Sequence, residues 1–311
     1  GDTDHVEAFM FSCESLDERT VEVLKQVAAG LSLKTKSFFY QSYAESFYQY
    51  MVHQPEDIWV RQVLLCDYHS DVMKIYRMEC NRRTTPMVVY IEKDERNFFA
   101  CGDYPEEEEK KQNVFTQMDE KMLAMAQELA EGQMITSVYL IGEGFSEEWM
   151  KESLRFLCRN RRVFQGNNLY SKGACYALRE RLYPTEISGR YVFLGEDKLK
   201  ANIGMKVYRQ GESSYLALLD AGVSWYDARF QTEVYLEEGN SFDIVLTPLN
   251  GKDARYGKVT LTGLPERKTP TRLYIEISMT GENKVRLYVE DLGFGELSPS
   301  GYQKWTENFE I

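Results

Sequence analysis

The sequence lacks any run of about 18 consecutive apolar residues, the length that a membrane-spanning helix requires. Its first residues, 1–5, carry no basic cluster and lead into no apolar stretch of the kind that marks a secretion signal. We therefore expect a cytoplasmic protein without membrane contact. With 311 residues, 43% of them hydrophobic and 28% charged, the chain has the composition of a globular protein and a length typical of about two domains.

Histidine is scarce and cysteine is scattered, which excludes most metal and nucleophile patterns. His5, His53 and His69 occur without the paired spacing of a zinc site. The six cysteines form no Cys-x-x-Cys pair, so we predict reduced thiols and neither a disulfide nor a zinc framework. His69 is close to Cys66 and Asp67, but neighbouring side chains of a strand point to opposite faces, which argues against a nucleophilic triad. We predict no catalytic residue and no metal site.

Basic residues are outnumbered by acidic ones. The chain has 37 Lys and Arg against 49 Asp and Glu, for a formal net charge of −12. Binding to nucleic acid or to an anionic membrane is driven by clustered Lys and Arg, so neither partner is expected. A protein or peptide partner is the remaining prediction.

The N-terminal 183 residues alternate between strand-like and helix-like patterns, which predicts an α/β domain. Ser15 and Glu18 form a capping-box pattern at the start of a helix that Gly30 ends. Residues 93–113 are rich in charge and are predicted as a solvated loop. A helix over 119–131 places a row of Met residues on one face, as a core-facing helix does. Strand patterns occur at 6–11, 37–40, 63–66, 72–79 and 87–92.

The central block is a strand at 138–141 that ends in Gly142-Glu143-Gly144-Phe145, with a helix expected to start at Ser146. Glycines that precede a helix N-terminus let backbone N–H groups approach the phosphates of a nucleotide. The acidic residues that follow in the first helical turn would instead repel phosphate. For Phe145 two readings remain open: it covers an adenine face, or it fills the pocket.

From residue 184 onward the pattern alternates with period two, which is typical of antiparallel strands. Two rows of apolar residues, starting at Leu273 and at Val285, face each other across a turn at 281–283. We predict a linker over 184–200 and an antiparallel β-sandwich over 201–311.

These segments occur in the order found in a known family. The block at 138–146 resembles the adenosine-binding corner of the actin-like ATPase superfamily. Residues 191–194 and 257–295 resemble the interdomain linker and the last strands of the peptide-binding sandwich in DnaK-type heat-shock chaperones. The resemblance covers the end of lobe one, a reduced lobe two, the linker and the sandwich. It implies an α/β lobe of actin-like, ribonuclease-H-like fold followed by an all-β antiparallel sandwich.

The departures from this family concern its nucleotide site. Where the chaperones have Asp-Leu-Gly-Gly-Gly-Thr in the second phosphate loop, this chain has Asp67-Tyr68-His69-Ser70-Asp71-Val72. Without the glycines, several N–H groups cannot converge on phosphate. The resemblance implies a magnesium-water ligand at Asp67, and the alternative is a polar strand end. The vestigial nucleotide site would consist of Asp67, Gly142, Glu143, Gly144 and Phe145.

The resemblance also implies two loops, 209–215 and 237–241, that would arch over a bound peptide. In this chain both loops are polar or acidic, whereas the family has small apolar residues there. The candidate partner-binding residues are Gly211, Glu212, Ser213, Tyr215, Glu238 and Gly239.

We therefore predict a non-catalytic, chaperone-like protein-interaction module without a cofactor. One alternative is an ATP-dependent chaperone whose N-terminal lobe is missing from this chain. ATP or ADP with magnesium would then bind only in the full-length protein, where that lobe supplies the first phosphate loop. A second alternative is a carbohydrate- or surface-binding sandwich that uses Tyr215, Trp225 and Tyr226. We also expect self-association through the surface left by the absent lobe, and a linker that is permanently packed through residues 191–194.

Overall fold

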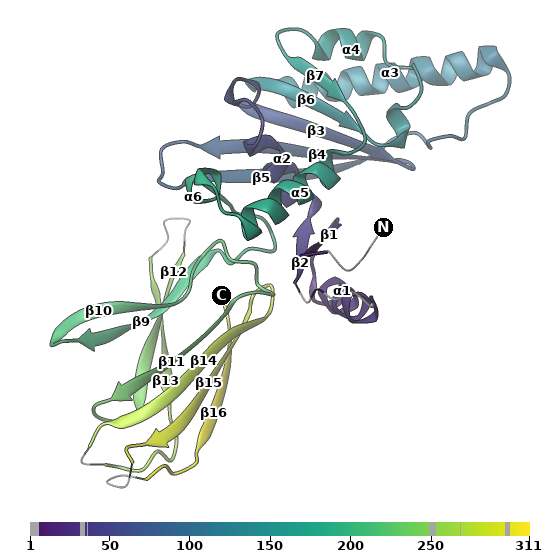
Figure 1. Ribbon diagram of the computed structural model, residues 1–311. Helices are drawn as coiled ribbons and strands as arrows, with labels where there is room; N and C mark the ends of the chain where they lie inside the picture. Colours follow the sequence, from purple (N-terminus) through teal and green to yellow (C-terminus); the bar gives the residue numbers. More distant parts are fainter. Residues whose placement is uncertain (1–5, 32–34, 36, 249–252, 268, 296–298) are drawn as a thin grey trace. The chain divides into compact units, whose positions relative to one another are not determined.

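The computed structural model describes residues 6–31, 35, 37–248, 253–267, 269–295 and 299–311 (Figure 1). The chain forms two compact units that do not follow its order. Unit 1 comprises Gly1–Ser15 and Ala28–Gly195, and unit 2 comprises Leu16–Val27 and Glu196–Ile311. The prediction about residues 1–5 lies outside the described residues. Among the helices of the described residues, none combines the length and the apolar character needed to cross a membrane.

Unit 1 contains a six-stranded sheet in the order β7-β6-β3-β4-β5-β8. Its centre is an antiparallel meander of β3, β4 and β5, and the pairs β3–β6, β6–β7 and β5–β8 are parallel. The strands are β3 (Gln62–His69), β4 (Val72–Asn81), β5 (Met87–Asn97), β6 (Ile135–Ile141), β7 (Arg162–Gln165) and β8 (Tyr191–Phe193).

One face of this sheet is covered by α3 (Glu108–Ala130) (Figure 1). Leu64 and Cys66, which alternate along β3, pack with α3 in one buried cluster. Side chains at alternate positions of a strand share a face, and positions three and four apart share a face of a helix. The helix therefore contributes the row predicted from its spacing, namely Met118, Met122, Met125 and Leu129.

The opposite face packs with α2 (Tyr43–Val52) and α5 (Leu169–Leu182). Val63 and Leu65, the intervening residues of β3, belong to this second buried cluster. The sheet thus has helices on both faces, as the alternation of strand and helix patterns predicted.

The charged segment at 93–113 is a loop only over residues 98–107, so the predicted bounds of that loop were wrong at both ends. β5 continues to Asn97, and α3 begins at Glu108. Charged side chains are compatible with both elements because most of them are exposed, and the half-buried Arg96 pairs with Glu128 at 2.7 Å. Acidic residues in the first turn of α3 also suit the helix dipole.

The remaining strands of unit 1 are a parallel pair, β1 (Phe9–Cys13) and β2 (Phe38–Ser42). Four aromatic rings meet on this pair, with neighbouring centroids 5.0–6.4 Å apart: Phe9, Phe11, Phe38 and Tyr40. Helix α1 (Glu18–Gly30) lies between β1 and β2 in the chain. Its first turn is capped by Asp17 Oδ1, which accepts from the Thr20 N–H at 2.7 Å, and not by Ser15 as predicted.

The predicted linker contains α6 (Glu186–Arg190) and β8. β8 pairs in parallel with β5, and the Leu194 N–H donates to the Val89 carbonyl at 3.2 Å. Tyr191 and Phe193 are buried in the core of unit 1. The segment expected to join two domains therefore ends as an edge strand of the unit 1 sheet.

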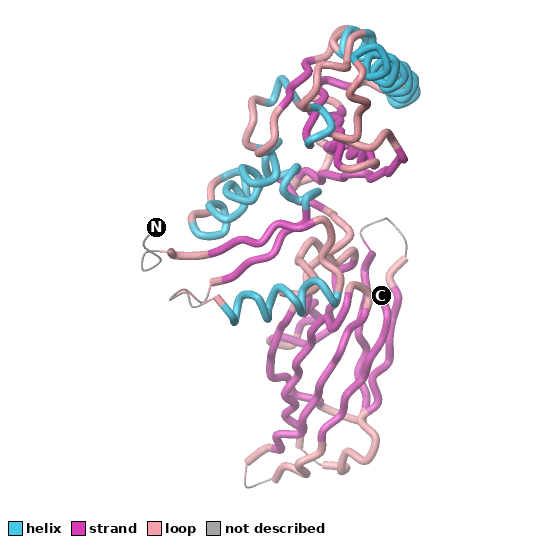
Figure 2. Tube along the Cα trace, turned by 90° about the vertical axis from the view of Figure 1, so that its right-hand side faces the viewer, coloured by secondary structure: helices cyan, strands magenta, loops and turns pink. Residues whose placement is uncertain are grey.

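Unit 2 contains two four-stranded antiparallel sheets, in the orders β10-β9-β12-β13 and β11-β14-β15-β16. Figure 2 shows the strands of this unit in magenta. The predicted apolar rows are confirmed, since alternate residues of β14 and β15 from Leu273 and Val285 onward are buried. The strands are β9 (Ala201–Arg209), β10 (Glu212–Leu219), β11 (Arg229–Leu236), β12 (Ser241–Pro248), β13 (Arg255–Thr260), β14 (Thr271–Gly281), β15 (Lys284–Gly293) and β16 (Lys304–Glu310).

Residues 16–27, which include most of α1, belong to unit 2. The Trp225 indole donates to the Leu16 carbonyl at 3.0 Å, and Lys284 Nζ lies 3.1 Å from Glu18 Oε1. A side chain at Gly281 would collide with the Glu18 carboxylate, because an added Cβ would lie 2.1 Å from it. Glycine at this position lets the Glu18 carboxylate lie close to the β14–β15 turn.

Candidate functional site

Parallel pairing of β3 with β6 brings the predicted nucleotide corner together. Asp67 lies opposite Ile141 in this pairing, so the residue after it and Gly142 meet at one edge of the sheet. The structure thus places Asp67 near the Gly142–Gly144 turn, with which the family resemblance grouped it. The space between them is occupied by the protein itself.

Tyr68 fills this corner. Its side chain is fully buried, and its hydroxyl donates to the Phe99 carbonyl at 2.6 Å. A Cβ added to Gly144 would lie 2.1 Å from the Tyr68 ring, and one added to Gly142 would lie 2.3 Å from the Tyr68 carbonyl oxygen. The two glycines thus make room for Tyr68. The chaperone motif has leucine, without an aromatic ring, at the position of this tyrosine.

Phe145 belongs to the same aromatic cluster. It is 4% exposed, and its ring centroid lies 5.6 Å from that of Tyr68 and 5.9 Å from that of Trp149. Its carbonyl accepts from Gln165 Nε2 at 2.6 Å. Of the two readings of Phe145, this geometry corresponds to a side chain that fills the pocket.

The helix expected at Ser146 is absent from that position, so this prediction was wrong. A single 3-10 turn, η3 (Glu143–Phe145), follows Gly142, and α4 (Glu152–Leu157) starts later. The first N–H groups of α4 already donate to Asp119, at 2.8 Å from Glu152 and 3.0 Å from Ser153. Burial would raise the pKa of Asp119, but these bonds and that of the Ser153 hydroxyl lower it below its usual value. The first two N–H groups of α4 are therefore already bonded to a carboxylate, which leaves them unavailable to a phosphate.

Asp67 is enclosed by protein groups. It is 4% exposed, Tyr170 donates its hydroxyl proton to Oδ2 at 2.8 Å, and His69 Nε2 lies 3.1 Å from Oδ1. Burial raises the pKa of Asp67, and the Tyr170 bond and His69 offset part of that rise. Within the described ranges, no three His, Cys, Asp or Glu side chains gather as a metal ion would require.

The neighbouring thiol is equally unsuited to chemistry. Cys66 is buried, and burial raises the pKa of its thiol to about 12. A thiol with this pKa is not a nucleophile at neutral pH, since the thiolate is the reactive form. The raised pKa of the Cys66 thiol is therefore a second reason why Cys66, Asp67 and His69 do not form a nucleophilic triad.

A cavity of about 520 Å³ opens beside the corner, in the region of the Glu143 turn. One basic side chain, Lys111, lines it and lies 3.1 Å from Glu147. The other charged residues of its lining are Glu106, Glu108, Glu143 and Glu147. This excess of carboxylates opposes the binding of a polyphosphate.

Unit 2 has a larger groove, of about 690 Å³, between β9–β10 on one side and β11 on the other. Tyr215 and Glu238, one from each predicted loop region, line this groove. Its apolar lining comes from both sheets and consists of Met205, Val207, Leu216, Val234, Leu236, Phe242 and Leu273. The groove thus combines an apolar floor with two of the predicted residues.

The other predicted loop residues lie in or beside two connecting turns, and the segment predicted as a loop at 209–215 is mostly strand, because β9 continues to Arg209 and β10 begins at Glu212. Gly211, Glu212 and Ser213 form the exposed tip of the β9–β10 hairpin, and Gly239 lies between β11 and β12. Gly211 and Gly239 have φ of +85° and +77°, a region that favours glycine. Their positions identify them as turn residues beside the groove. The partner-binding role of all six residues stays a prediction.

Sequence reasoning missed two tyrosines that line the groove, Tyr208 and Tyr235, which are 76% and 57% exposed. The available signal was their alternation with the half-buried Val207 and Val234, which places the rings on the outer faces. Trp225, in contrast, is buried. It is therefore not an exposed aromatic of the kind that a sugar ring would need.

The comparisons with known proteins divide the chain near residue 197. A family of unknown function, described as DUF5716 C-terminal, matches residues 1–196. The chain belongs to this family. A domain of unknown function, DUF8552, matches residues 198–311. No curated protein matches the chain.

Among solved structures, one titled "Alp12 filament structure" is similar to this DUF5716 chain, with 11% identity and a TM-score of 0.35. The alignment covers 49% of this chain and 56% of that one, so the chain spans about half the length of that structure. A likeness of this degree carries no conclusion about function. The descriptions of these matches do not mention a DnaK-type chaperone, and that resemblance rests on the sequence motifs.

Proposed function

We propose that this chain is a non-catalytic, chaperone-like protein-interaction module that binds an extended peptide segment of another protein. The observation that carries the proposal is the groove between β10 and β11, with its apolar floor and the predicted residues Tyr215 and Glu238 in its lining. Ligand grooves combine an apolar lining with a few polar groups that fix orientation, and this groove has both.

The strands that border the groove are suited to an extended partner. β10 and β11 are each the first strand of their sheet, so one edge of each has no neighbouring strand within its sheet. An edge strand presents N–H and C=O groups to which an extended peptide adds as a further strand. Alternate side chains of that peptide would then reach the apolar floor.

The rims of the groove carry opposite charges. Lys206 and Arg209 lie on the β9 side, and Glu233, Glu237 and Glu238 lie on the β11 side. Complementary charges fix the direction and register of a bound segment more than they add affinity. The exposed tyrosines beside the rims are of the type enriched at interaction hot spots.

We also propose a specific fold for the chain, namely an actin-like, ribonuclease-H-like lobe followed by a β-sandwich, as in DnaK-type chaperones. Support comes from the three-stranded antiparallel meander of unit 1 that continues into parallel strands, with helices on both faces. Further support is the packing of residues 191–193 as β8, which corresponds to a docked linker. In the absence of an open nucleotide corner, we infer that this linker stays docked.

The non-catalytic part of the proposal rests on the filled corner. Tyr68 occupies the volume beside Gly142 and Gly144, and carboxylates surround the adjoining cavity. A nucleotide would have to displace a buried ring and overcome like charge. For the proposed module, binding therefore uses a static surface without an ATP cycle.

The test is fluorescence anisotropy with a labelled nine-residue peptide that carries Leu or Val at alternate positions. We expect saturable binding by the parent chain and at least tenfold weaker binding by Val207→Asp, whose side chain lines the groove and is half-buried. Val163→Asp, on the half-buried valine of edge strand β7 in unit 1, is the matched control and should bind as the parent does. Absence of binding, or equal binding by Val207→Asp, would count against the proposal.

A second candidate, carbohydrate binding, is favoured by the three exposed tyrosines at the groove, Tyr208, Tyr215 and Tyr235. Rings of this kind stack on the apolar faces of sugars. A panel of soluble oligosaccharides in the same titration separates the two candidates. Sugar binding that is lost in Tyr208→Ala and retained in Val207→Asp would replace the peptide proposal.

A further inference from the structure

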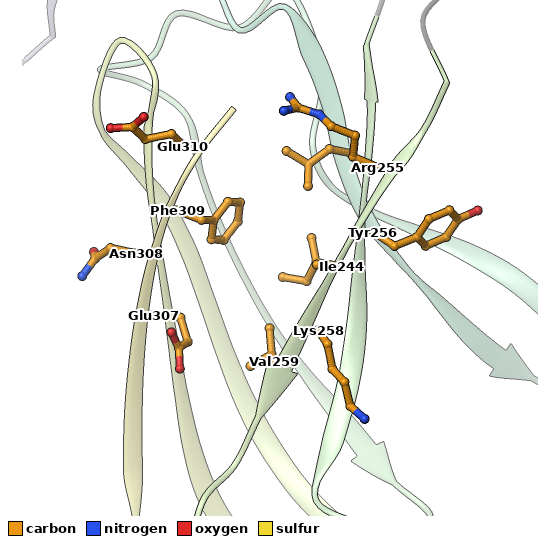
Figure 3. A pocket seen from close by; sticks show the side chains of 11 residues that line it. Ile244, Arg255, Tyr256, Lys258, Val259, Glu307, Asn308, Phe309 and Glu310 are labelled. Carbon is orange, nitrogen blue, oxygen red and sulfur yellow. The ribbon is translucent and has the colours of Figure 1, made fainter.

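A second opening lies between the other two edge strands of unit 2, β13 and β16, each the last strand of its sheet. The cavity there measures about 260 Å³ (Figure 3). Figure 3 shows Phe309 of β16 pointing across the gap toward Ile244 of β12. With Leu246 and Val259, these side chains give the cavity an apolar lining. We call this opening the seam cavity.

The seam cavity lies beside a glycine at the centre of β13. Gly257 pairs with Ile244, whose side chain lines the cavity, so a side chain at position 257 would enter the same space. A Cβ added to Gly257 would meet nothing within 4 Å. The cavity is smaller than the ~300–1,000 Å³ typical of small-molecule pockets. Its size and lining suit a single large side chain.

The mouth of the seam cavity is charged on both sides. Arg255 and Lys258 belong to β13, and Glu307 and Glu310 belong to β16 (Figure 3). Arg255 pairs with Leu246, and Glu307 pairs with the buried Leu287, so both charged residues lie on the inner faces of their sheets. A guanidinium binds the face of an aromatic ring, and a carboxylate accepts from a hydroxyl. Together with the apolar lining, these groups match a tyrosine side chain.

Unit 2 also carries a protruding tyrosine, Tyr302. This residue is 85% exposed, so it does not occupy the seam cavity of its own chain. Its φ of +54° lies in the left-handed region, which is unusual for a bulky side chain and costs free energy. A non-glycine residue persists in this region when its surroundings hold it there, and such residues cluster at functional sites.

The segment that carries Tyr302 is attached to a buried ion pair. Its N–H donates to Ser300 Oγ at 2.9 Å, and the Gly301 N–H donates to Asp291 Oδ2 at 2.7 Å. Arg267 bonds both oxygens of Asp291, at 2.7 and 2.9 Å, and donates to the Pro299 carbonyl at 3.0 Å. The side chain of Asp291 is fully buried. An internal ion pair therefore fixes the segment that presents an exposed ring.

We propose that Tyr302 of one copy of this chain inserts into the seam cavity of a second copy. The preformed ring and the preformed cavity match in size, in apolar character and in the charged groups at the mouth. Since they are different surfaces of the same unit, the interface is heterologous, and each bound copy keeps one free ring and one free cavity. Assembly therefore proceeds head to tail into rings or longer chains of copies. It involves neither the groove at β10 and β11 nor its partner.

Sedimentation velocity over a wide range of protein concentration tests this interface. We expect the parent chain to assemble as concentration rises, and Tyr302→Ser and Gly257→Leu each to remain monomeric. The leucine fills the seam cavity without a backbone clash, so this variant should fold. An equimolar mixture of the two variants should give a one-to-one dimer and nothing larger, because only one intact ring and one intact cavity remain per pair.

Three further variants complete the experiment. Tyr208→Ser removes another highly exposed tyrosine of unit 2, and Gly166→Leu adds a leucine where a Cβ also meets nothing within 4 Å, so both should assemble as the parent does. Tyr302→Phe should weaken assembly by roughly tenfold, as expected from the loss of one hydrogen bond to a charged group. A parent chain that stays monomeric, or assembly that persists in Gly257→Leu or Tyr302→Ser, would overturn the proposal.

Discussion

Gly144 in unit 1 lies beside a space that a side chain fills, whereas Gly257 in unit 2 lies beside a space that is open. At Gly144 the ring of Tyr68 approaches so closely that any side chain would collide, at 2.1 Å from an added Cβ. At Gly257 nothing lies within 4 Å of an added Cβ, and a cavity remains. A glycine leaves space beside the backbone, and a residue distant in the sequence decides whether that space is filled.

This difference bears on how a glycine-rich turn is interpreted. The turn at 142–144 has the order of a phosphate-binding corner, but its glycines accommodate Tyr68. Gly257 belongs to no phosphate-binding pattern, yet open space remains beside it. Motif spacing describes the backbone, whereas ligand space depends on the side chains that converge there.

The largest expected effect is on the filled site. Tyr68→Ala should lower the free energy of unfolding by about 3–5 kcal/mol, as for other buried aromatic residues cut to alanine. Phe309→Ala, on the half-buried ring of the seam cavity, should cost about 1 kcal/mol because little of its packing is lost. Chemical denaturation of both variants measures the difference. Similar losses in the two variants would remove the distinction between the sites.

A smaller effect is expected from alanine at the glycines themselves. Gly142→Ala should cost about 2–3 kcal/mol, because its φ is +102° and its Cβ would lie 2.3 Å from the Tyr68 carbonyl oxygen. Gly257→Ala should be neutral or stabilising by up to about 1 kcal/mol, since the backbone of the unfolded chain becomes more restricted. Thermal unfolding of the pair tests this. A destabilised Gly257→Ala would mean that the seam cavity is not open space.

Two carboxylates of unit 1 should show opposite dependence of stability on pH. Burial raises the pKa of Asp67 in the folded state, so its protonated form stabilises the fold, and this contribution is lost as pH rises through the folded pKa. Hydrogen bonds lower the pKa of Asp119, so its contribution is lost as pH falls through the folded pKa. Compared with the parent, Asp67→Asn should therefore increase the free energy of unfolding at neutral pH more than at acid pH. Asp119→Asn should decrease the free energy of unfolding at neutral pH. Denaturation curves from pH 3 to pH 7 would contradict this account if both variants shifted in the same direction.

The smallest expected effect is an absence of heat when Mg-ATP is titrated into the chain. We expect none for the parent, and none for Tyr68→Ala, because carboxylates still line the adjoining cavity after the ring is removed. Isothermal titration checks both. Micromolar affinity, about −8 kcal/mol, in the parent would overturn the idea of a filled corner. The same affinity in the variant alone would show that the ring is the whole barrier.

Much of the fold could be predicted from spacing, because regular elements repeat on their own period. The row at Met118 and the rows of β14 and β15 were predicted correctly for this reason. The start of α3 at Glu108 was missed, since a run of charged residues has no period that separates a helix surface from a loop. The absence of a helix at Ser146 was equally hidden, because Asp119 supplies the cap of α4 from a distant helix.

The position of the candidate sites was only partly predictable. The family resemblance grouped Asp67 with Gly142, and the parallel pairing of β3 with β6 places the two residues near each other. The filling of that corner by Tyr68 depends on packing among segments far apart in the chain, which spacing does not encode. Tyr302 gave no signal at all in the sequence, because its conformation is imposed by the buried pair of Arg267 and Asp291.

The placement of residues 16–27 in unit 2 has an evolutionary consequence. The two family descriptions divide the chain near residue 197, as if each part were inherited as a separate module. Yet the carbonyl of Leu16, from the first part, accepts the buried indole N–H of Trp225 in the second. A recombination event at that boundary would deliver a β unit without its helix, with a buried donor left unsatisfied. Selection would therefore tend to transmit the two parts together, as a single heritable block.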